Sequence, residues 1–175
     1  MQDQTQNTES TRQQIQAFGD AYQYDTSYLQ EMLQFSPGAF GAYAPAQGLS
    51  HFRDQLPLDA HFVARIVTMM VEDCGPCAQL NLRMAVEAGV SRALLQTLLD
   101  APESLPTHLA DVRAQTRFIV GAEPEDEART ERLLERYGAA GIAEMATAIA
   151  GSQIFPTLKR ALGHAKACEM LTLDF

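Results

Sequence analysis

Apolar residues recur along most of the chain at steps of three and four, the spacing that places side chains on one face of an α-helix. The clearest case is residues 58–72, where Leu58, Phe62, Ile66 and Met69 form one stripe beside a second apolar stripe. Two stripes predict a helix that is buried on most sides. Because no stretch alternates with a period of two between turn residues, we predict an all-α fold, a single-domain helical bundle.

Similar patterns predict the other helices, and turn residues predict where they end. Residues 1–9 are rich in Gln and Thr, and we expect a disordered tail there and a single all-helical domain over residues 10–175. One helix is expected from near Ser10 to Ser36, with Tyr24 and Tyr28 on one face. Further helices are expected at 39–49, at 77–88 before Gly89, at 91–99 capped by Ser91, at 107–120, at 124–137 opened by Pro124, at 142–150 and at 155–171.

The charge of the chain limits its partners. With 22 acidic and 13 basic residues, the formal net charge is -9, which repels nucleic-acid phosphates and anionic lipid surfaces, so we expect neither nucleic acid nor membrane as a partner. Residues 1–14 contain no apolar stretch of the kind found in a signal peptide. The longest apolar run, 62–71, contains Arg65 and is too short to span a bilayer. We therefore expect a cytoplasmic protein, in which thiols stay reduced unless they cycle.

A Cys-x-x-Cys sequence is the main candidate for chemistry. Cys74 and Cys77 enclose Gly75 and Pro76 and lie between two predicted helices. Proline favours the first helical positions because its φ angle is fixed and its missing N–H leaves no hydrogen bond unmade. This predicts Cys77 in the first turn of a helix and Cys74 at its mouth, where the helix dipole stabilises a thiolate. We expect a redox-active pair that closes a disulfide.

The cysteines also have other interpretations. The pair can be two small buried apolar residues, and a zinc site would need two more ligands, whereas Cys168 is remote and the histidines show no paired spacing. We therefore expect no metal and no cofactor, and we assign Cys168 to the core of the last helix. Cys-Gly-Pro-Cys is also the active-site sequence of thioredoxin, but that fold needs a strand before the motif, and residues 62–71 have helical spacing.

The motif and its flanks resemble a known family. An apolar helix, the Cys-x-x-Cys and the run Ala-Val-Glu-Ala-Gly-Val-Ser-Arg-Ala-Leu-Leu-Gln at 85–96 make residues 57–99 similar to the alkyl hydroperoxidase D and carboxymuconolactone decarboxylase family. The resemblance implies a helical bundle of that type with the Cys-x-x-Cys hairpin at 57–99, and assembly as a homotrimer or a multiple of it. In the cysteine-bearing branch it implies an antioxidant peroxidase that reduces organic or hydrogen peroxide, with electrons from a dithiol donor such as a lipoylated protein.

Two positions depart from the pattern of that family. Its peroxidase branch has a proton relay made of a glutamate twelve residues before the first cysteine and a histidine four after the second, and this chain has Phe62 and Asn81 there. Neither side chain transfers a proton near neutral pH. The resemblance therefore carries over the cysteine pair without the relay, and we expect inefficient peroxidase activity.

Several polar residues near the motif can substitute for the relay. Glu72 and Asp73 precede the first cysteine directly, and Asp59 and His61 lie on the preceding helix. Asn81 shares a helix face with Cys77 and can orient a water or a substrate. Each also has an ordinary interpretation, as acids at helix ends and as a surface or packed histidine.

The residues and the resemblance together predict a thiol–disulfide oxidoreductase. Cys77 is expected to attack the peroxide and Cys74 to resolve the product, while the donor can attack Cys74 if that sulfur is the more exposed. The alternative is a non-catalytic helical module whose cysteines lock the hairpin or report oxidation to a partner.

Overall fold

The structure, a computed structural model, describes residues 2–165 and 171–175, with side chains from residue 7 onward. Within these residues the chain is all-α and contains no strand, as the sequence predicts. The helices are α1 (Gln2–Tyr22), α2 (Ser27–Phe35), α3 (Pro37–Tyr43), α4 (Gln47–His51), α5 (Leu58–Val71), α6 (Gly75–Ala88), α7 (Arg92–Asp100), α8 (Thr107–Ile119) and α9 (Glu127–Ala161), with 3₁₀ turns at Ala44–Ala46 and Pro102–Ser104.

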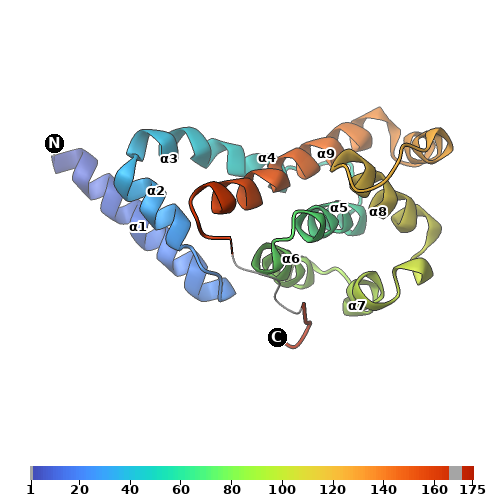
Figure 1. The fold of residues 1–175 in the computed structure, drawn as a ribbon, viewed down its shortest axis with the longest axis horizontal. Coiled ribbons are helices and arrows are strands. Elements are labelled where there is room, and N and C mark those ends of the chain that lie inside the picture. Colours follow the sequence, from blue (N-terminus) through green and yellow to red (C-terminus); the bar gives the residue numbers. More distant parts are fainter. Residues whose placement is uncertain (1, 166–170) are drawn as a thin grey trace.

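Helix α5 is the centre of the bundle. It packs against α6, α8 and α9 (Figure 1), and every side chain from Ala60 to Met69 is buried, including those of His61 and Arg65. The two predicted apolar stripes explain this, because a helix that is apolar on most of its circumference is stable only when neighbours cover it on several sides. The prediction of a buried helix at 58–72 is confirmed.

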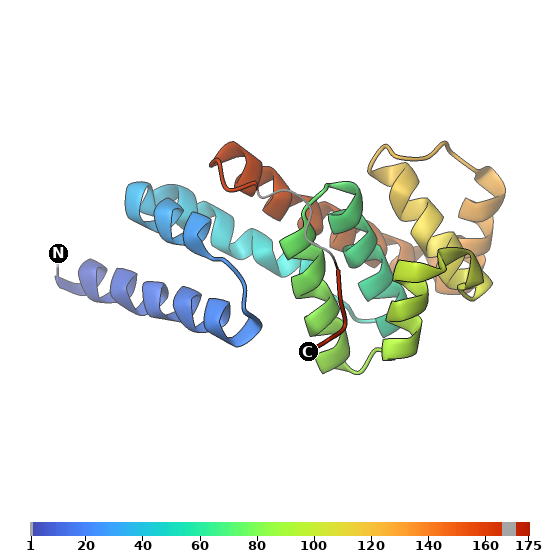
Figure 2. The same ribbon diagram turned by 60° about the horizontal axis from the view of Figure 1, so that its bottom comes forward.

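Helices α1, α2 and α3 form a layer at one end of the molecule, on the side opposite α7 and α8 (Figures 1 and 2). Their shared apolar cluster packs on Leu80 of α6 and on Phe155 and Leu158 of α9. Its buried members are Ile15, Tyr24, Tyr28, Leu29, Leu33, Phe40 and Tyr43. Between this cluster and the main core, Met69, Ala78 and the two motif cysteines form a small cluster of their own. The motif therefore lies where the N-terminal layer meets the central helices.

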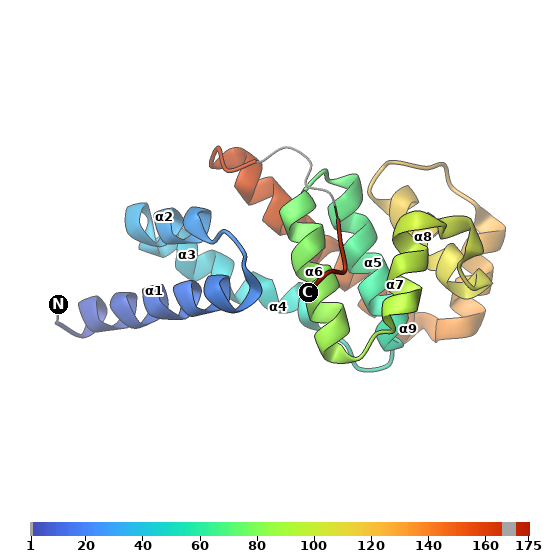
Figure 3. The ribbon, with the colours of Figure 1, turned by 90° about the horizontal axis from the view of Figure 1, so that it is seen from below.

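The end of the chain lies along α6 (Figure 3). The side chain of Gln79 donates to the carbonyl of Thr172 at 2.8 Å and accepts from its N–H at 3.0 Å, and Arg92 donates to the carbonyls of Leu173 and Phe175. These contacts hold residues 171–175 against the outside of α6, with Leu171 and Leu173 packed on the core. In the described ranges, no helix combines the length and the hydropathy that crossing a membrane requires.

The N-terminal predictions need two corrections. Residues 2–9 belong to α1 and do not form a tail, because the segment has no Gly or Pro and bonds such as Thr11 Oγ1 to Asn7 O run along it. The expected helix at 10–36 is two helices, because Gln23 has a φ of 50° and the Tyr24 N–H turns back to the carbonyl of Gly19 at 2.9 Å. A Cβ on residue 19 would lie 2.9 Å from the Tyr24 carbonyl, so this turn needs glycine.

The C-terminal predictions also need correction. Helix α9 bends at Gly138, where φ is 67° and the backbone is not helical, so the break expected between 124–137 and 142–150 is confirmed. No break separates 142–150 from the helix expected at 155–171, and the two form one continuous stretch. Helix α9 begins at Glu127, not at Pro124, because the Asp126 side chain caps it by accepting from the Arg129 N–H at 3.1 Å. The helix expected at 155–171 ends at Ala161, and the core role predicted for Cys168 lies outside the described residues.

Two predicted helix boundaries hold. Helix α6 ends at Ala88, and Gly89 follows with a φ of 101°, the left-handed conformation expected there. Helix α7 follows Ser91, but the Ser91 side chain makes no capping hydrogen bond, so that part of the prediction is wrong.

Candidate active site

The end of α5 determines where the first cysteine lies. Asp73 has a φ of 52°, its N–H donates to the Met70 carbonyl at 3.2 Å, and the Cys74 N–H donates to the Met69 carbonyl at 3.0 Å. This pair of bonds is the Schellman motif, which usually has glycine at the left-handed position. Aspartate tolerates that conformation better than most residues. The motif reverses the chain sharply and brings Cys74 to the start of α6.

The first turn of α6 holds the second cysteine. The Cys74 carbonyl accepts from the Ala78 N–H at 2.9 Å, Pro76 occupies an early helical position, and Cys77 follows in the same turn. The two sulfurs are joined in a disulfide. The predicted positions of both cysteines are confirmed. When the disulfide is reduced, the unpaired N–H groups of this turn and the positive end of the helix dipole favour a thiolate at Cys77.

The two cysteines line different cavities. Cys77, 1% exposed, lines a cavity of about 470 Å³ where α1, α2 and α3 meet α5, α6 and α9. Most of this wall is apolar or aromatic, with Phe18, Leu80 and Phe155 among its members. Cys74, 7% exposed, lines a smaller cavity of about 190 Å³ together with Lys159 and Arg160. A small molecule in the large cavity can therefore reach Cys77, and a group in the small one can reach Cys74.

A buried tyrosine lies against the Cys77 sulfur. The Tyr24 hydroxyl is 3.8 Å from Cys77 Sγ and 3.4 Å from the Tyr28 hydroxyl. Burial raises the pKa of Tyr24, so this hydroxyl keeps its proton at neutral pH and can donate to a thiolate. The ammonium of Lys159 lies over both rings, 4.2 Å from the Tyr24 centroid and 5.2 Å from that of Tyr28. This cation–π contact fixes the rings that position the hydroxyl.

Asn81 lies next to the second cysteine, as its spacing predicts. Its Nδ2 donates to the Cys77 carbonyl at 2.8 Å, and its side chain is 3% exposed and lines the large cavity. The Oδ1 atom is buried without a hydrogen-bond partner among the described residues. An unpaired buried acceptor is costly, so a hydroxyl group of a bound molecule is a suitable partner for it.

Of the other predicted substitutes for the relay, Glu72 and Asp73 line the small cavity with Cys74, and none lines the large cavity beside Cys77. Burial opposes ionisation of Glu72, but hydrogen bonds from Gln153 at 2.9 Å and Arg160 at 2.6 Å outweigh it, and its pKa is lowered. A carboxylate held in this way is a poor proton donor. Asp73 forms the turn before Cys74, and Asp59 pairs with His108 at 4.0 Å at the opposite end of α5.

His61 is buried at 2% exposure but does not line the large cavity; its neighbour on the helix, Arg65, does. Their contact joins His61 Nε2 and an Arg65 terminal nitrogen at 3.4 Å. Burial, followed by the positive charge of Arg65, lowers the pKa of His61 to about 4, so the ring is neutral at pH 7. Burial also lowers the pKa of Arg65 to about 10, which still leaves it charged. The structure therefore separates His61 from the cysteines and brings Arg65 to the cavity.

Tyr24, His51 and Arg65 line the large cavity and are not among the residues that the sequence indicates as candidates. Arg65 carried a signal, because a charge inside an otherwise apolar buried helix is rare unless it has a partner or a role. Tyr24 was assigned to a helix stripe, and only the turn at residues 23–26 directs it toward Cys77. His51 is remote in sequence from the motif, and no spacing pattern indicates it.

The fold and the site define an all-α domain with a disulfide at the start of an internal helix and a largely apolar cavity beside one sulfur. No family model, no curated protein and no solved structure matches this chain. The resemblance to the alkyl hydroperoxidase D family therefore rests on residues 57–99 alone.

Proposed function

We propose that the protein is a thiol–disulfide oxidoreductase that reduces organic peroxides through Cys74 and Cys77, as the family resemblance implies. The observation that carries the proposal is that Cys77, joined to Cys74 in a disulfide, lines a mostly apolar cavity of about 470 Å³. Pockets of this size and lining bind small organic molecules. A disulfide that only locks the hairpin needs no such cavity beside its sulfur.

The reaction proceeds in three balanced steps. The Cys77 thiolate attacks the outer oxygen of R–O–OH, the O–O bond breaks, and the alkoxide takes up a proton, giving a sulfenic acid at Cys77 and an alcohol. The Cys74 thiol then attacks that sulfur, which forms the disulfide and releases water. Finally, a dithiol donor transfers two electrons: it opens the disulfide, returns both cysteines to thiols and becomes a disulfide itself.

Two residues assist at the attacking sulfur. The Tyr24 hydroxyl donates to the Cys77 thiolate, and the Asn81 Oδ1 accepts from the hydroperoxide O–H. Neither is a strong acid near pH 7, so the proton for the alkoxide comes from solvent, and chemistry is slower than with a histidine at position 81.

The donor enters from the side of Cys74. This sulfur is the more exposed of the two and lines the small cavity beside Arg160. Attack on Cys74 leaves Cys77 as the departing thiolate, which the helix N-terminus stabilises. The resemblance adds a lipoylated protein as the donor and a homotrimeric assembly, and the sequence pattern supports a cytoplasmic location.

Turnover separates this proposal from the alternative of a structural or redox-sensing disulfide. The assay follows consumption of cumene hydroperoxide with reduced dihydrolipoamide in excess. We expect many turnovers per protein chain, none with Cys77→Ser, and a stalled sulfenic acid on Cys77, trapped by dimedone, with Cys74→Ser. Cys168→Ser is the control and should keep full activity. A protein that consumes only one equivalent of peroxide is a lock or a sensor, and the proposal is then wrong.

A further inference from the structure

Arg65 is a buried cation without a carboxylate partner. Its side chain is 3% exposed, yet no acidic group in the described part of the chain lies within ion-pair distance of it. Its contacts are long: 3.4 Å to His61 Nε2, 3.5 Å to His51 Nε2 and 4.0 Å to Met84 Sδ. Its Nε has no partner among the described residues. A charge removed from water in this way is costly unless something compensates it.

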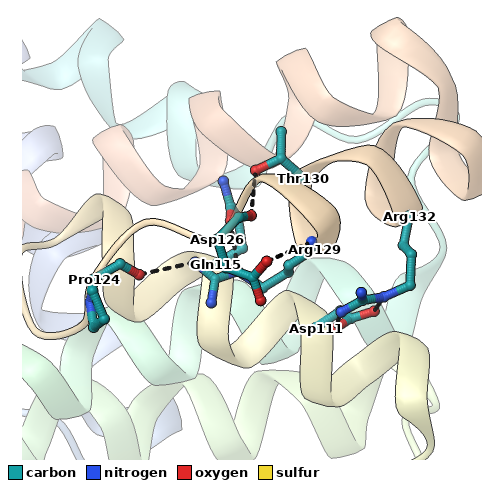
Figure 4. A network of polar contacts seen from close by, with 7 residues as sticks. All are labelled: Asp111, Gln115, Pro124, Asp126, Arg129, Thr130 and Arg132. Atoms are coloured by element: carbon teal, nitrogen blue, oxygen red, sulfur yellow. Dashed lines mark hydrogen bonds and ion pairs between the residues drawn. The ribbon is translucent and has the colours of Figure 1, made fainter.

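Another buried arginine of the same chain illustrates the difference. Arg129, 5% exposed, donates from Nε to Gln115 Oε1 at 2.8 Å and from a terminal nitrogen to the Pro124 carbonyl at 3.3 Å (Figure 4). In the same network, Arg132 holds Asp111 through two bonds of 2.6 and 2.9 Å. These guanidinium groups have oxygen partners, whereas the partners of Arg65 among the described residues are two imidazole nitrogens and a thioether sulfur.

The histidines around Arg65 do not compensate its charge. His51 Nδ1 lies 2.9 Å from the Gln47 carbonyl, so this nitrogen carries the proton and Nε2 accepts from Arg65. Both rings are therefore neutral partners. The face of Phe62, 5.0 Å from the Arg65 Cζ, adds a cation–π contact but no negative charge.

Arg65 lines the same cavity as Cys77, and the remaining wall is mostly apolar. We propose that this cavity binds an apolar monocarboxylate, with its carboxylate on Arg65 and its hydrocarbon chain along the aromatic wall. If the protein is the peroxidase proposed above, on which this step rests, the site also defines its substrate class. The preferred peroxide is then a hydroperoxide that carries a carboxylate on an apolar chain, as fatty-acid hydroperoxides do. A planar guanidinium suits a carboxylate because it can donate two parallel N–H bonds.

The binding test uses the oxidised full chain, which has no free attacking thiol, so binding is measured without turnover. Calorimetric titration compares octanoate with octanol, which has the same chain length without the charge. We expect octanoate to bind more tightly than octanol. Arg65→Gln should weaken octanoate about tenfold or more, the loss expected for one charge-assisted pair, while octanol changes little. Arg129→Gln, which removes a buried arginine far from the cavity, should leave both affinities unchanged.

A second variant tests the same site without removing the arginine. Phe62→Glu places a carboxylate beside the Arg65 guanidinium, so it should abolish the preference for octanoate and preserve octanol binding. If Arg65→Gln does not fold, this variant still tests whether the ligand carboxylate binds at Arg65. Equal affinities of octanoate and octanol for the wild type, or equal losses for both ligands in the variants, would overturn the subsite.

Substrate preference gives the catalytic readout. For the wild type, kcat/KM should be higher for a fatty-acid hydroperoxide than for its methyl ester, and the ratio should approach one in Arg65→Gln. Octanoate binding without turnover of any peroxide refutes the proposed function and leaves the carboxylate site standing. Turnover of cumene hydroperoxide without octanoate binding refutes the carboxylate site and leaves the proposed function standing.

Discussion

The contact between the Tyr24 hydroxyl and Cys77 Sγ, at 3.8 Å, gives a prediction about thiol reactivity. Tyr24→Phe removes this hydroxyl and keeps the ring, its edge contact with Tyr28 and the position of Lys159 over it. Because burial raises the pKa of Tyr24, the hydroxyl is a neutral donor over the working pH range and stabilises the thiolate form of Cys77. Its removal should therefore raise the pKa of the Cys77 thiol.

The magnitude follows from the hydrogen bond. Bonds to charged groups contribute about 1.5–3 kcal/mol, and a long contact to sulfur belongs below that range, at about 1 kcal/mol. Since one pKa unit corresponds to about 1.36 kcal/mol, the Cys77 pKa should rise by about 0.7 unit. Below that pKa the thiolate fraction, and with it the rate of alkylation, should fall about fivefold.

The assay is the pH dependence of iodoacetamide alkylation of Cys77 in a Cys74→Ser background, where no disulfide forms. Tyr28→Phe is the matched control, because it removes the neighbouring hydroxyl, 3.4 Å from that of Tyr24, without touching the sulfur. Its effect should stay within about twofold, since it removes no bond to the thiolate. An unchanged alkylation profile in Tyr24→Phe, or equal shifts in both variants, would refute the role of the Tyr24 hydroxyl.

Three further predictions concern stability, proton transfer and assembly. His61 has a folded-state pKa of about 4, below its unfolded value, so the unfolded chain binds more protons and the protein becomes less stable as the pH drops toward 4. The free energy of unfolding, measured by urea titration, should fall by about 2 kcal/mol between pH 7 and pH 5, and His61→Gln should remove most of this pH dependence. Asn81→His should raise peroxide turnover toward the roughly 10²–10⁴-fold gain of positioned acid–base catalysis; an unchanged rate in steady-state assays means that another group supplies the proton. Sedimentation at micromolar concentration should reveal a homotrimer, and a clean monomer would contradict this assembly. Phe35 is 77% exposed, so Phe35→Ser should weaken the trimer if this side chain lies in the interface.

The sequence alone determined the fold class and the geometry of the motif. Periodicity identified the buried helix at 58–72 because two apolar stripes at helical spacing require burial whatever the partners are. Proline and glycine between Cys74 and Cys77 indicated the helix start, and Gly89 indicated its end, because both residues act through local backbone preferences. These signals need no knowledge of distant contacts.

The periodicity of apolar residues did not predict where some of the helices begin and end. The stripe through Tyr24 was continuous in sequence, but α1 ends at Tyr22, because Gln23 has a positive φ and the Tyr24 N–H turns back to the Gly19 carbonyl. In α9, one continuous helix follows Gly138 where two helices, at 142–150 and at 155–171, were expected. Hydrophobic periodicity identifies the faces of a helix but not the residues at which the backbone leaves it, so it predicted neither outcome.

Only the tertiary structure decided which side chains share the site. Asn81 reaches the Cys77 carbonyl because four residues make one helical turn, so sequence spacing was sufficient for that pair. Tyr24 reaches the cavity from the turn between α1 and α2, and Arg65 reaches it from α5, whereas His61, one helical turn from Arg65, does not line it. Spacing along a chain fixes neighbours within a helix, whereas the packing of several helices fixes which of their faces meet around Cys77.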